Sequence, residues 1–472
     1  MLLPKAFEDY TRQLMGDARY QRYLDGLALP PSTSIRLNPF KVKDAIDGAV
    51  NEVVPDGNTT PVPWCRLGHY LPTRPTFTSD PLLHAGLYYV QESSSMFVCE
   101  AVRQLIDEPV LMLDLCAAPG GKSTALRSVL PEGSLLVSNE PVKLRASILS
   151  ENVQKFGHPD MVVTNNYPKD FQKAGMQFDA ILADVPCSGE GMFRKDANAI
   201  SEWSPENVDH CWRLQRSIVE DIWPSLRPGG WLIYSTCTLN AHEDEENVAW
   251  IAETLGADVI PLKTDAEWHI TGALTGHLPV YRFIPGITPG EGLFMAVLRK
   301  HGHSEAVNWQ SDKGNGNSNG KQRKRNKPQA QPAAKGPSYD GWLDGDFEII
   351  ANKDRYVAVP KRWQPLYDTM KAKLHVIHAG VELGTTKGKD LIPSPSLALS
   401  IRLKEGAFPM AELPQSEAII YLRREAIQLD AGQPKGFTLV TYKGHPLGFV
   451  KNIGNRANNL YPQEWRIKSS YV

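Results

Sequence analysis

Short apolar runs alternate with longer segments of mixed character between residues 111 and 238. The runs that predict buried strands are LMLDL (111–115), SLLVSNE (134–140), MVVTNN (161–166), FDAILADVP (178–186) and GGWLIYSTC (229–237). The segments that predict helices between them are KSTALRSVL (122–130), VKLRASILSENVQKF (142–156) and a stretch from about Pro205 to Leu226. This alternation is typical of α/β proteins with a mostly parallel sheet covered on both faces, and GLFMAVLRK (292–300) is predicted as its edge strand.

Small and polar residues follow these predicted strands at their carboxyl ends, where ligands bind in such sheets. The loop CAAPGGKS follows the first strand, and Glu140 ends the second. Asp184 and Cys187 end a later strand, and Cys237 ends the next one. The sequence therefore predicts that these side chains share one crevice.

The loop CAAPGGKS differs from the common nucleotide-binding loops. Cys116 replaces the first glycine of the phosphate-binding pattern GxxxxGK[ST], and Pro119 lacks an amide that could bind phosphate. The GxGxxG of dinucleotide-binding proteins is also absent. Small residues still allow a phosphate-free ligand such as S-adenosylmethionine to approach the backbone, and Glu140 can accept its ribose hydroxyls. Taken alone, the loop leaves such a site and a plain strand-to-helix turn equally open.

Two thiols and a carboxylate indicate a reaction. Cytosine C5 accepts a methyl group only after a nucleophile has added to C6, and a thiolate performs this addition well. Asp184 can hydrogen-bond the base edge and help the ring to accept the added electron density. Free cysteines are usually small buried apolar residues, but Cys187 in DVPC and Cys237 in STCT both stand at strand ends. This pairing favours catalysis, and DVPC lacks the aromatic that amine methyltransferases place after their D/N-P-P motif.

Several motifs together carry a family resemblance. LDLCAAPGGKS, ADVPCSGEGMFRKD, LRPGGWLIYSTCTLNAHEDEENV and PGEGLFMAVLRK resemble the motifs of RNA 5-methylcytosine methyltransferases of the NOL1/NOP2/Sun family. SIRLNPFK, VPW and HAGLYYVQESSSM extend the match, which covers about residues 30 to 300. The tail TYKGHPLGFVKNIGNRANNLYPQEWRI is similar to the PUA-like module of the bacterial subfamily that acts on small-subunit ribosomal RNA.

The resemblance implies a fold and an activity. The expected fold is a Rossmann-like S-adenosylmethionine-dependent methyltransferase sheet with an N-terminal accessory α+β region and a C-terminal β-rich PUA-like module. The expected reaction is cytosine-C5 methylation of structured RNA, 16S ribosomal RNA in the small subunit, through a covalent bond from cysteine to C6. A methyltransferase of transfer RNA and a methyltransferase-fold RNA-binding assembly factor without activity are the alternatives.

The resemblance also implies roles for individual residues. Cys237 is expected to be the nucleophile and Cys187 the thiol that assists product release, although C5 methyltransferases of DNA carry their nucleophile in a PC motif. Asp184 is expected at the base, and Lys122 is expected to support the catalytic site. The residues expected to hold S-adenosylmethionine are Cys116, Ala117, Ala118, Pro119, Gly120, Gly121, Lys122, Glu140 and Asp184.

One position departs from the family pattern. The family often has an aspartate beside the adenine after the third strand, whereas this sequence reads NNYPKD with Tyr167 at that place. Asn165, Asn166 and Asp170 are the candidates to replace it.

Length and composition divide the chain, since 472 residues are too many for one core. The predicted regions are an N-terminal RNA-binding accessory region (1–105), a methyltransferase domain (106–300), a low-complexity linker (301–338) and a C-terminal PUA-like RNA-binding region (339–472). The linker carries KQRKRNK, which is either a solvated charge run or a phosphate-binding segment.

The net charge of −2 requires any basic RNA-binding surface to be local. Arg194 and Lys195 are candidates to bind phosphates near the active site, with an ordinary solvated loop as the alternative. In the tail, cations interleave with aromatic residues, a pattern suited to RNA backbone contacts and base stacking. These residues are Lys443, Lys451, Arg456 and Arg466 with Tyr442, Tyr461 and Trp465.

The remaining features suggest a cytoplasmic protein, expected to be a monomer. Six cysteines occur without a CxxC pair or a zinc-like spacing, so no metal site is predicted and the thiols are expected to be reduced. No apolar run reaches the roughly 20 residues of a membrane span. The start, MLLPKAFEDY, does not resemble a signal peptide.

Overall fold

The computed structural model describes residues 2–42, 46–54, 57–304, 341–388 and 390–468. The KQRKRNK run and nearly all of the predicted linker lie outside these ranges, so no structure is assigned to them. Within the described residues, no helix is long and apolar enough to cross a membrane.

A nine-stranded sheet runs through the middle of the described structure, in the order β10-β12-β9-β8-β5-β6-β7-β15 with β11 beside β12. Its elements within the methyltransferase motifs are β5 (Leu111–Asp114), α6 (Gly121–Val129), β6 (Leu135–Asn139), α7 (Lys143–Phe156), β7 (Met161–Thr164), α8 (Pro168–Ala174), β8 (Phe178–Asp184), α9 (Ala197–Glu202), α10 (Pro205–Ile222), β9 (Leu226–Thr236), α11 (Glu245–Trp250), β10 (Ala257–Val259), β11 (Tyr281–Phe283) and β12 (Leu293–Lys300). The strands β5 to β9 pair in parallel, which confirms the predicted α/β sheet.

Two details of the predicted sheet are wrong. β12 is not an edge strand, because β10 and β11 both pair with it, and it runs antiparallel to β9. The helix predicted to reach Leu226 ends at Ile222, and Leu226 already begins β9. Pro224 lies between them in a single 3₁₀ turn, consistent with the missing amide of proline and its restriction of the preceding residue.

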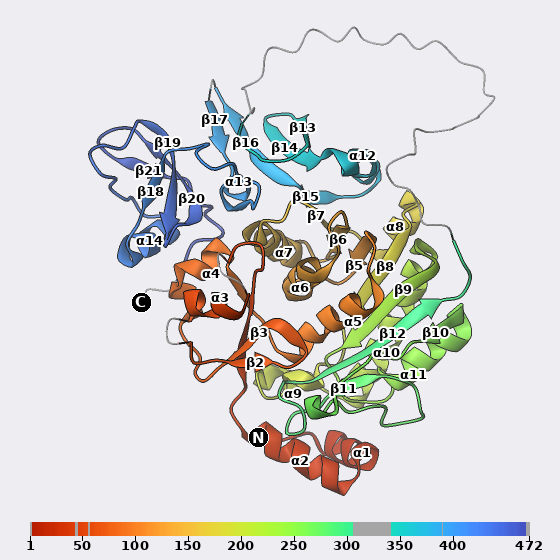
Figure 1. The fold of residues 1–472 in the computed structure, drawn as a ribbon. Helices are drawn as coiled ribbons and strands as arrows, with labels where there is room; N and C mark the ends of the chain where they lie inside the picture. Colours follow the sequence, from red (N-terminus) through yellow and green to blue (C-terminus); the bar gives the residue numbers. More distant parts are fainter. Residues whose placement is uncertain (1, 43–45, 55–56, 305–340, 389, 469–472) are drawn as a thin grey trace, which may run out of the picture.

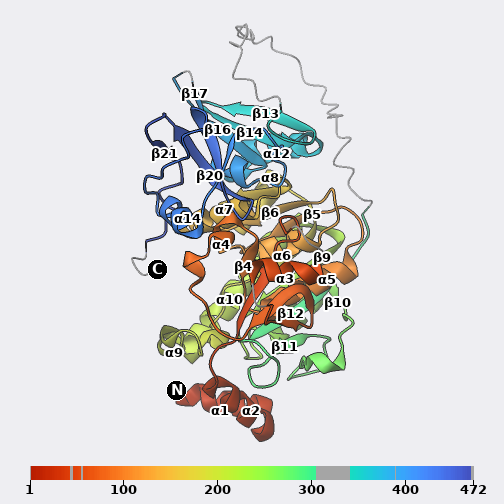
Figure 2. The same ribbon diagram turned by 60° about the vertical axis from the view of Figure 1, so that its left-hand side comes forward.

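The N-terminal region packs two helices and a four-stranded sheet, in the order β2-β3-β1-β4, onto the methyltransferase. Its elements are α1 (Lys5–Met15), α2 (Asp17–Ala28), β1 (Thr33–Leu37), α3 (Ile46–Val53), β2 (Thr60–Val62), β3 (Cys65–Leu71), α4 (Pro81–Ala85), β4 (Tyr88–Val90) and α5 (Val98–Leu105). Figures 1 and 2 show α1 and α2 at one end of the molecule and the C-terminal sheets at the other.

The C-terminal region forms two further four-stranded sheets, β13-β14-β16-β17 and β18-β19-β20-β21. Its elements are β13 (Phe347–Asn352), β14 (Arg355–Pro360), α12 (Gln364–Lys373), β15 (Val376–Ala379), β16 (Val381–Lys387), β17 (Asp390–Pro393), α13 (Pro395–Leu399), β18 (Met410–Glu412), α14 (Gln415–Leu422), β19 (Gly436–Tyr442), β20 (His445–Asn452) and β21 (Ala457–Asn459). One strand, β15, leaves these sheets and pairs antiparallel with β7, so the C-terminal region extends the methyltransferase sheet.

Alternate residues of the large sheet face two separate cores, as the two-residue period of a strand requires. Along β5, Leu111 and Leu113 point into one core, together with side chains of α8, α10 and α12. Met112 points into the other, together with side chains of α5, α6, α7 and the N-terminal sheet. Because α12 joins one core and the β18–β21 sheet joins the other, the C-terminal region packs into both.

Candidate active site

The two thiols predicted to be catalytic meet at the carboxyl ends of β8 and β9. These strands pair in parallel with Asp184 opposite Ser235, so the residues that follow leave the sheet side by side. The Sγ atoms of Cys187 and Cys237 lie 3.2 Å apart. The backbone N–H of Cys237 also donates to Sγ of Cys187, at 3.4 Å, and both residues are partly accessible.

The environments of these thiols differ in charge. The hydrogen bond from Cys187 lowers the pKa of Cys237, and the ammonium of Lys122 lowers it further, against burial and the charge of Asp184. The same hydrogen bond and burial raise the pKa of Cys187. These interactions favour the thiolate on Cys237 and the proton on Cys187. Burial also raises the pKa of the Cys116 thiol, which lies in the loop after β5.

Lys122 and Asp184 form an ion pair beside the thiols. Nζ of Lys122, in the first turn of α6, lies 2.8 Å from Oδ2 of Asp184. Ser235 donates its hydroxyl to Oδ1 of the same carboxylate at 2.7 Å. Burial lowers the pKa of Lys122, but the charge and hydrogen bond of Asp184 outweigh it, so the net pKa is raised and the amine stays charged.

The loop of residues 116–122 turns tightly between β5 and α6, against helix α7. Gly120 has φ +117°, and a Cβ there would lie 3.3 Å from both Leu149 and Asn152, so a side chain would be strained and crowded. Asn152 and Arg145 of α7 donate hydrogen bonds to carbonyls of this loop at 2.8 and 3.1 Å. The glycine therefore allows the loop to lie against α7.

Two buried carboxyl groups flank this loop, and each has an oxygen without a hydrogen-bond partner in the described part of the chain. Glu140 is 1% exposed; its Oε1 accepts from the amide of Val142, and its Oε2 lies 3.5 Å from Arg145. Asp114 at the end of β5 accepts from Ser123, and burial raises its pKa to about 7. Acceptors beside a glycine turn suit a ligand with hydroxyl and ammonium groups, so these residues fit S-adenosylmethionine.

Sequence reasoning gave Asp114 no role, although a single acid at the end of the apolar run LMLDL was a usable signal. It also gave none to Arg36, a fully buried residue of β1 that reaches the start of α6. The guanidinium of Arg36 donates to the carbonyls of Gly121 and Thr124 and to the hydroxyls of Thr124 and Ser128. The N-terminal region thus holds the helix that follows the glycine loop.

The candidates for the missing adenine-side aspartate occupy different positions. Tyr167 is 69% exposed, and Asp170 caps α8 by accepting from the amide of Tyr167. Asn166 exchanges hydrogen bonds with the backbone just before β15. Asn165 donates to the backbone carbonyl of Glu140 at 2.7 Å, so it contacts the residue whose carboxylate is predicted to bind the ribose.

The structure fits neither alternative for Arg194, a phosphate-binding cation or a solvated loop residue. Its guanidinium is buried and pairs with Glu291 through two contacts of 2.7 Å, and it also donates to backbone carbonyls of two glycines. These partners show that the Arg194 side chain links its own loop to Gly26 and to the segment of Gly290 and Glu291. Lys195, the next residue, is exposed.

The tail residues predicted to bind RNA divide into two groups. Tyr461 is buried and packs edge-on against Trp465, so it belongs to the core of the β18–β21 sheet. Trp465 lies under the ammonium of Lys155 of α7, and Lys451 pairs with Asp390. The tail cations that remain exposed are Lys443, Arg456 and Arg466.

Comparisons with known families agree with this arrangement. A model of the 16S rRNA methyltransferase RsmB/F family matches residues 104–299, and the N-terminal domain of 16S rRNA methyltransferase RsmF matches residues 3–93. The methyltransferase RsmF PUA domain matches residues 409–467. A crystal structure of a methyltransferase homologue from Pyrococcus horikoshii shares 26% identity, with a TM-score of 0.55 over 63% of this chain and 95% of that one. NSun6 from Pyrococcus horikoshii, crystallised with SFG, shares the fold at 20% identity and a TM-score of 0.55, over 64% and 99% of the two chains.

Two full-length relatives establish the family. Ribosomal RNA small subunit methyltransferase F of Erwinia tasmaniensis is 30% identical, over 98% of this chain and 97% of the relative. The protein of the same name from Escherichia coli O139:H28 is 31% identical, over 98% and 96%. The resemblance identified from the motifs is thereby confirmed, together with the Rossmann-like and PUA-like fold, and the chain belongs to the ribosomal RNA small subunit methyltransferase F family.

Proposed function

We propose that this protein methylates C5 of a cytosine in 16S ribosomal RNA, with S-adenosylmethionine as the methyl donor and Cys237 as the nucleophile. The observation that carries the proposal is the pair of thiols 3.2 Å apart, next to the Lys122–Asp184 ion pair at the carboxyl ends of β8 and β9. Membership of the family supports a ribosomal RNA substrate. We further propose that the protein acts as a monomer in the cytoplasm, where its cysteines stay reduced.

The cofactor would be held in the part of the crevice that lies at the carboxyl ends of β5 and β6. The residues assigned to it are those of the loop 116–122 together with Asp114, Glu140 and Asp184, with Asn165 on the adenine side. When bound, S-adenosylmethionine supplies an electrophilic methyl group. Glu140 and Asp114 each offer an acceptor oxygen without a hydrogen-bond partner among the described residues, and these oxygens suit hydroxyl and ammonium groups.

The protein's own groups account for activation of the base. The Cys237 thiolate adds to C6, which forms a sulfur–carbon bond and moves electron density to C5. Asp184 is fixed by Lys122 and Ser235, and its oxygens retain lone pairs that can accept from the exocyclic amine of the cytosine. C5 would then form a bond to the methyl group, the donor sulfur would keep the electron pair of the bond that breaks, and S-adenosylhomocysteine would be the leaving group.

Release reverses the addition. The proton on C5 leaves to a base, the electron pair of that bond re-forms the C5–C6 double bond, and the sulfur–carbon bond to Cys237 breaks. Cys187 is the group assigned to assist this step, because its sulfur lies beside the attacking sulfur. The nucleophile is therefore needed before the intermediate forms, and the release thiol only afterwards.

The RNA is proposed to lie across the exposed cations of the tail. Lys443, Arg456 and Arg466 are exposed on or beside the β18–β21 sheet, which is packed firmly on the N-terminal region through α4. Each lost phosphate contact should flatten the dependence of log affinity on log salt by roughly 0.7 to 0.9. Replacing all three by glutamine should therefore weaken RNA binding and reduce that slope.

The activity is tested by methyl transfer from labelled S-adenosylmethionine to naked 16S ribosomal RNA, to small subunits lacking the modification, and to transfer RNA. We expect label in 16S ribosomal RNA, and sequencing should place it at C5 of a cytosine. Label in transfer RNA only would establish the alternative substrate. Tight RNA binding without any label would indicate an assembly factor that keeps the fold and lacks the activity.

A further inference from the structure

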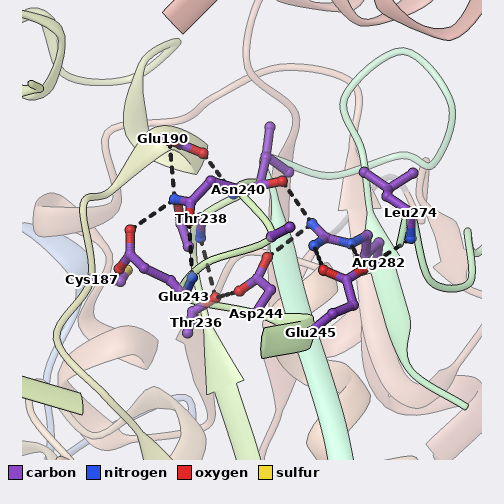
Figure 3. A network of polar contacts seen from close by, with 12 residues as sticks. Cys187, Glu190, Thr236, Thr238, Asn240, Glu243, Asp244, Glu245, Leu274 and Arg282 are labelled. Atoms are coloured by element: carbon purple, nitrogen blue, oxygen red, sulfur yellow. Dashed lines mark hydrogen bonds and ion pairs between the residues drawn. The ribbon is translucent and has the colours of Figure 1, made fainter. Parts of the chain in front are cut away.

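The loops that carry Cys187 and Cys237 are tied together by buried carboxylates, and we infer that Glu190 and Glu243 are positioning residues that hold the two thiols in contact. The inference rests on the proposed function, in which these thiols attack the base and release it. Figure 3 shows the network, with Cys187 on one side and Arg282 on the other.

Glu190 belongs to the loop of Cys187 and binds the loop of Cys237. Its Oε2 accepts the backbone N–H of Leu239 at 2.8 Å, two residues beyond the nucleophile. Its Oε1 accepts from the indole of Trp203 and the amide of Asn240, at 2.9 and 3.2 Å. The carboxylate is 1% exposed, so these contacts replace water entirely.

Glu243 makes the reciprocal contact. It belongs to the segment after Cys237, and its Oε2 accepts the backbone N–H of Ser188, the residue after Cys187, at 3.0 Å. Gln215 and Asn240 donate to its two oxygens at 2.6 and 2.8 Å. Each cysteine loop therefore supplies a carboxylate that fixes a backbone amide next to the other cysteine.

Two further contacts join the same two loops, and together with the contacts of Glu190 and Glu243 they form what we call the clasp. The hydroxyls of Ser188 and Thr238 lie 2.9 Å apart, and the amide of Gly191 donates to the carbonyl of Cys237 at 2.8 Å. On the side of the network away from Cys187, Arg282 of β11 donates to the carbonyl of Leu239 at 2.9 Å (Figure 3). Both backbone polar groups of Leu239 are thus bound: its N–H donates to Glu190, and its carbonyl accepts from Arg282.

The cluster destabilises the fold relative to apolar packing, which favours a role in positioning the two thiol loops. Arg282 is fully buried and pairs with Asp244 at 2.8 Å and with Glu245. With Glu190 and Glu243, the network contains four buried carboxyl groups and one buried guanidinium. Desolvating such groups costs several kcal/mol per ion, and apolar residues of similar volume often stabilise a fold as well or better. What apolar residues cannot do is fix two backbone amides beside two thiols.

The charge of Glu243 and the clasp act on Cys237 in opposite directions. The charged and titratable groups that act on Cys237 are Lys122 of α6, Asp184 of β8, Cys187 and Glu243. The negative charge of Glu243 raises the pKa of Cys237, whereas the hydrogen bond from Cys187 lowers it. Removing the charge alone would therefore lower the pKa of Cys237. Loosening the clasp would raise it, because the hydrogen bond from Cys187 would be lost.

The test is the pH dependence of iodoacetamide alkylation, read separately for each cysteine by peptide mass spectrometry on the full chain. The variants are Glu190→Gln and Glu243→Gln. Glutamine keeps the shape of glutamate, but its amide NH2 group would face the N–H groups from which the carboxylate oxygens now accept. Glu246→Gln is the matched control, since Glu246 is an exposed neighbour whose carboxylate pairs with His242. Thermal unfolding confirms folding, and Thr238→Val is a milder variant if either glutamine variant fails to fold.

We expect the alkylation midpoint of Cys237 to rise in Glu190→Gln and Glu243→Gln and its rate at pH 7 to fall roughly tenfold, as one pKa unit of lost thiolate requires. Thr238→Val should shift the midpoint in the same direction by less, and Glu246→Gln should leave it unchanged. In a Cys187→Ala background the upward shift should disappear, because the clasp acts through Cys187. An unchanged or lowered midpoint, or an upward shift that persists without Cys187, would overturn the inference. Alkylation needs neither RNA nor cofactor, so a failure of the proposed methylation would be recognised separately.

Discussion

The two halves of the catalytic crevice are held in different ways. The thiol half is fixed by groups close to it in the methyltransferase, since Glu190, Glu243 and Arg282 all lie within residues 104–299. The cofactor half depends on both accessory regions. Arg36 of the N-terminal sheet holds the start of α6, and the backbone before β15 holds Asn166 at the end of β7. The comparison indicates that both accessory regions support the cofactor site, whereas the groups that tie the two thiol loops to each other come from the methyltransferase. The N-terminal region still meets these loops, because α1 and α2 pack against Leu239 and Tyr10 of α1 accepts from the amide of Ala241.

Removal of the C-terminal region should have the largest effect. A chain ending at Lys300 would lose β15 from the edge of β7 and the α12 side chains of Leu366, Tyr367 and Met370 from the core. Deleting one large core side chain costs about 2–5 kcal/mol, and whole domains have only about 5–15 kcal/mol of stability. We expect no cooperative melting transition and no cofactor binding in calorimetry. A truncated chain that melts cooperatively and binds the cofactor with full affinity would show that the methyltransferase is self-sufficient.

Acidification should loosen the same region. Burial lowers the pKa of His84 to about 3, of His158 to about 2 and of His378 to about 4. Each lies at or near the packing of the C-terminal region: His84 contacts Tyr461, and His378 lies on β15. The unfolded chain protonates these imidazoles near pH 6.5 and the folded chain does not, so stability falls as the pH drops below 6.5.

At pH 5 the loss is roughly 2 kcal/mol for each histidine, from 1.4 kcal/mol per unit of difference. Urea unfolding at pH 7 and pH 5 measures this loss of stability. The loss should be smaller in His378→Gln by the contribution of one histidine. If His378→Gln and the parent chain lost the same stability between pH 7 and pH 5, the assignment would be contradicted. Cofactor affinity should decline over the same range before the thiol pair is disturbed.

Replacement of Arg36 tests the N-terminal support of the cofactor half. Arg36→Met removes hydrogen bonds to two carbonyls and two hydroxyls spread along α6 from Gly121 to Ser128, and leaving buried acceptors unsatisfied costs about 1–3 kcal/mol each. We expect lower stability and at least tenfold weaker cofactor binding, with the alkylation profile of Cys237 unchanged. Arg103→Met is the control, since Arg103 is exposed and pairs with Glu100 on its own helix. A shift in Cys237 reactivity would show that the halves are coupled.

Gly120 provides the smallest of these effects and the most local one. Gly120→Ala combines an unfavourable φ with a Cβ 3.3 Å from Leu149 and Asn152. Gly175→Ala, at φ +72° with open space around it, carries the backbone strain alone, about 1–2 kcal/mol. Cofactor affinity should fall in Gly120→Ala and stay unchanged in Gly175→Ala, as measured by calorimetry. Equal affinity in both variants would remove the loop from the cofactor site.

The local pattern of the sequence was sufficient for the parallel strands and for the residues at their ends. Each strand is a short apolar run with its own turn signal, so β5 to β9 and the positions of Cys187, Cys237 and Asp184 follow from nearby residues. The pairing of β15 with β7 does not, because it joins segments more than 200 residues apart and β15 is only four residues long. β10 and β11 are three residues each, which is too short for a period to show.

Buried charges account for the other misjudged residues. Arg194 stands in a polar loop and has the sequence context of an exposed cation, but Glu291, 97 positions away, neutralises it. The run HEDEEN likewise has the composition of a solvated segment. Three of its four acids, Glu243, Asp244 and Glu245, are nevertheless buried, because Arg282 and donors from other elements meet them, whereas Glu246 is exposed. Partners so distant in sequence leave no local signal, although an acidic run directly after a strand-end cysteine was worth attention.

Trapping of the RNA on the protein tests the central claim most directly, because it identifies the thiol that attacks. Cys187→Ala incubated with S-adenosylmethionine and labelled substrate RNA should give a slowly migrating adduct on denaturing gels, since attack by Cys237 proceeds and release is impaired. Cys237→Ala and the double variant should give neither adduct nor methylation. A stable adduct in Cys237→Ala and none in Cys187→Ala would reverse the two roles and contradict the assignment of the thiolate to Cys237.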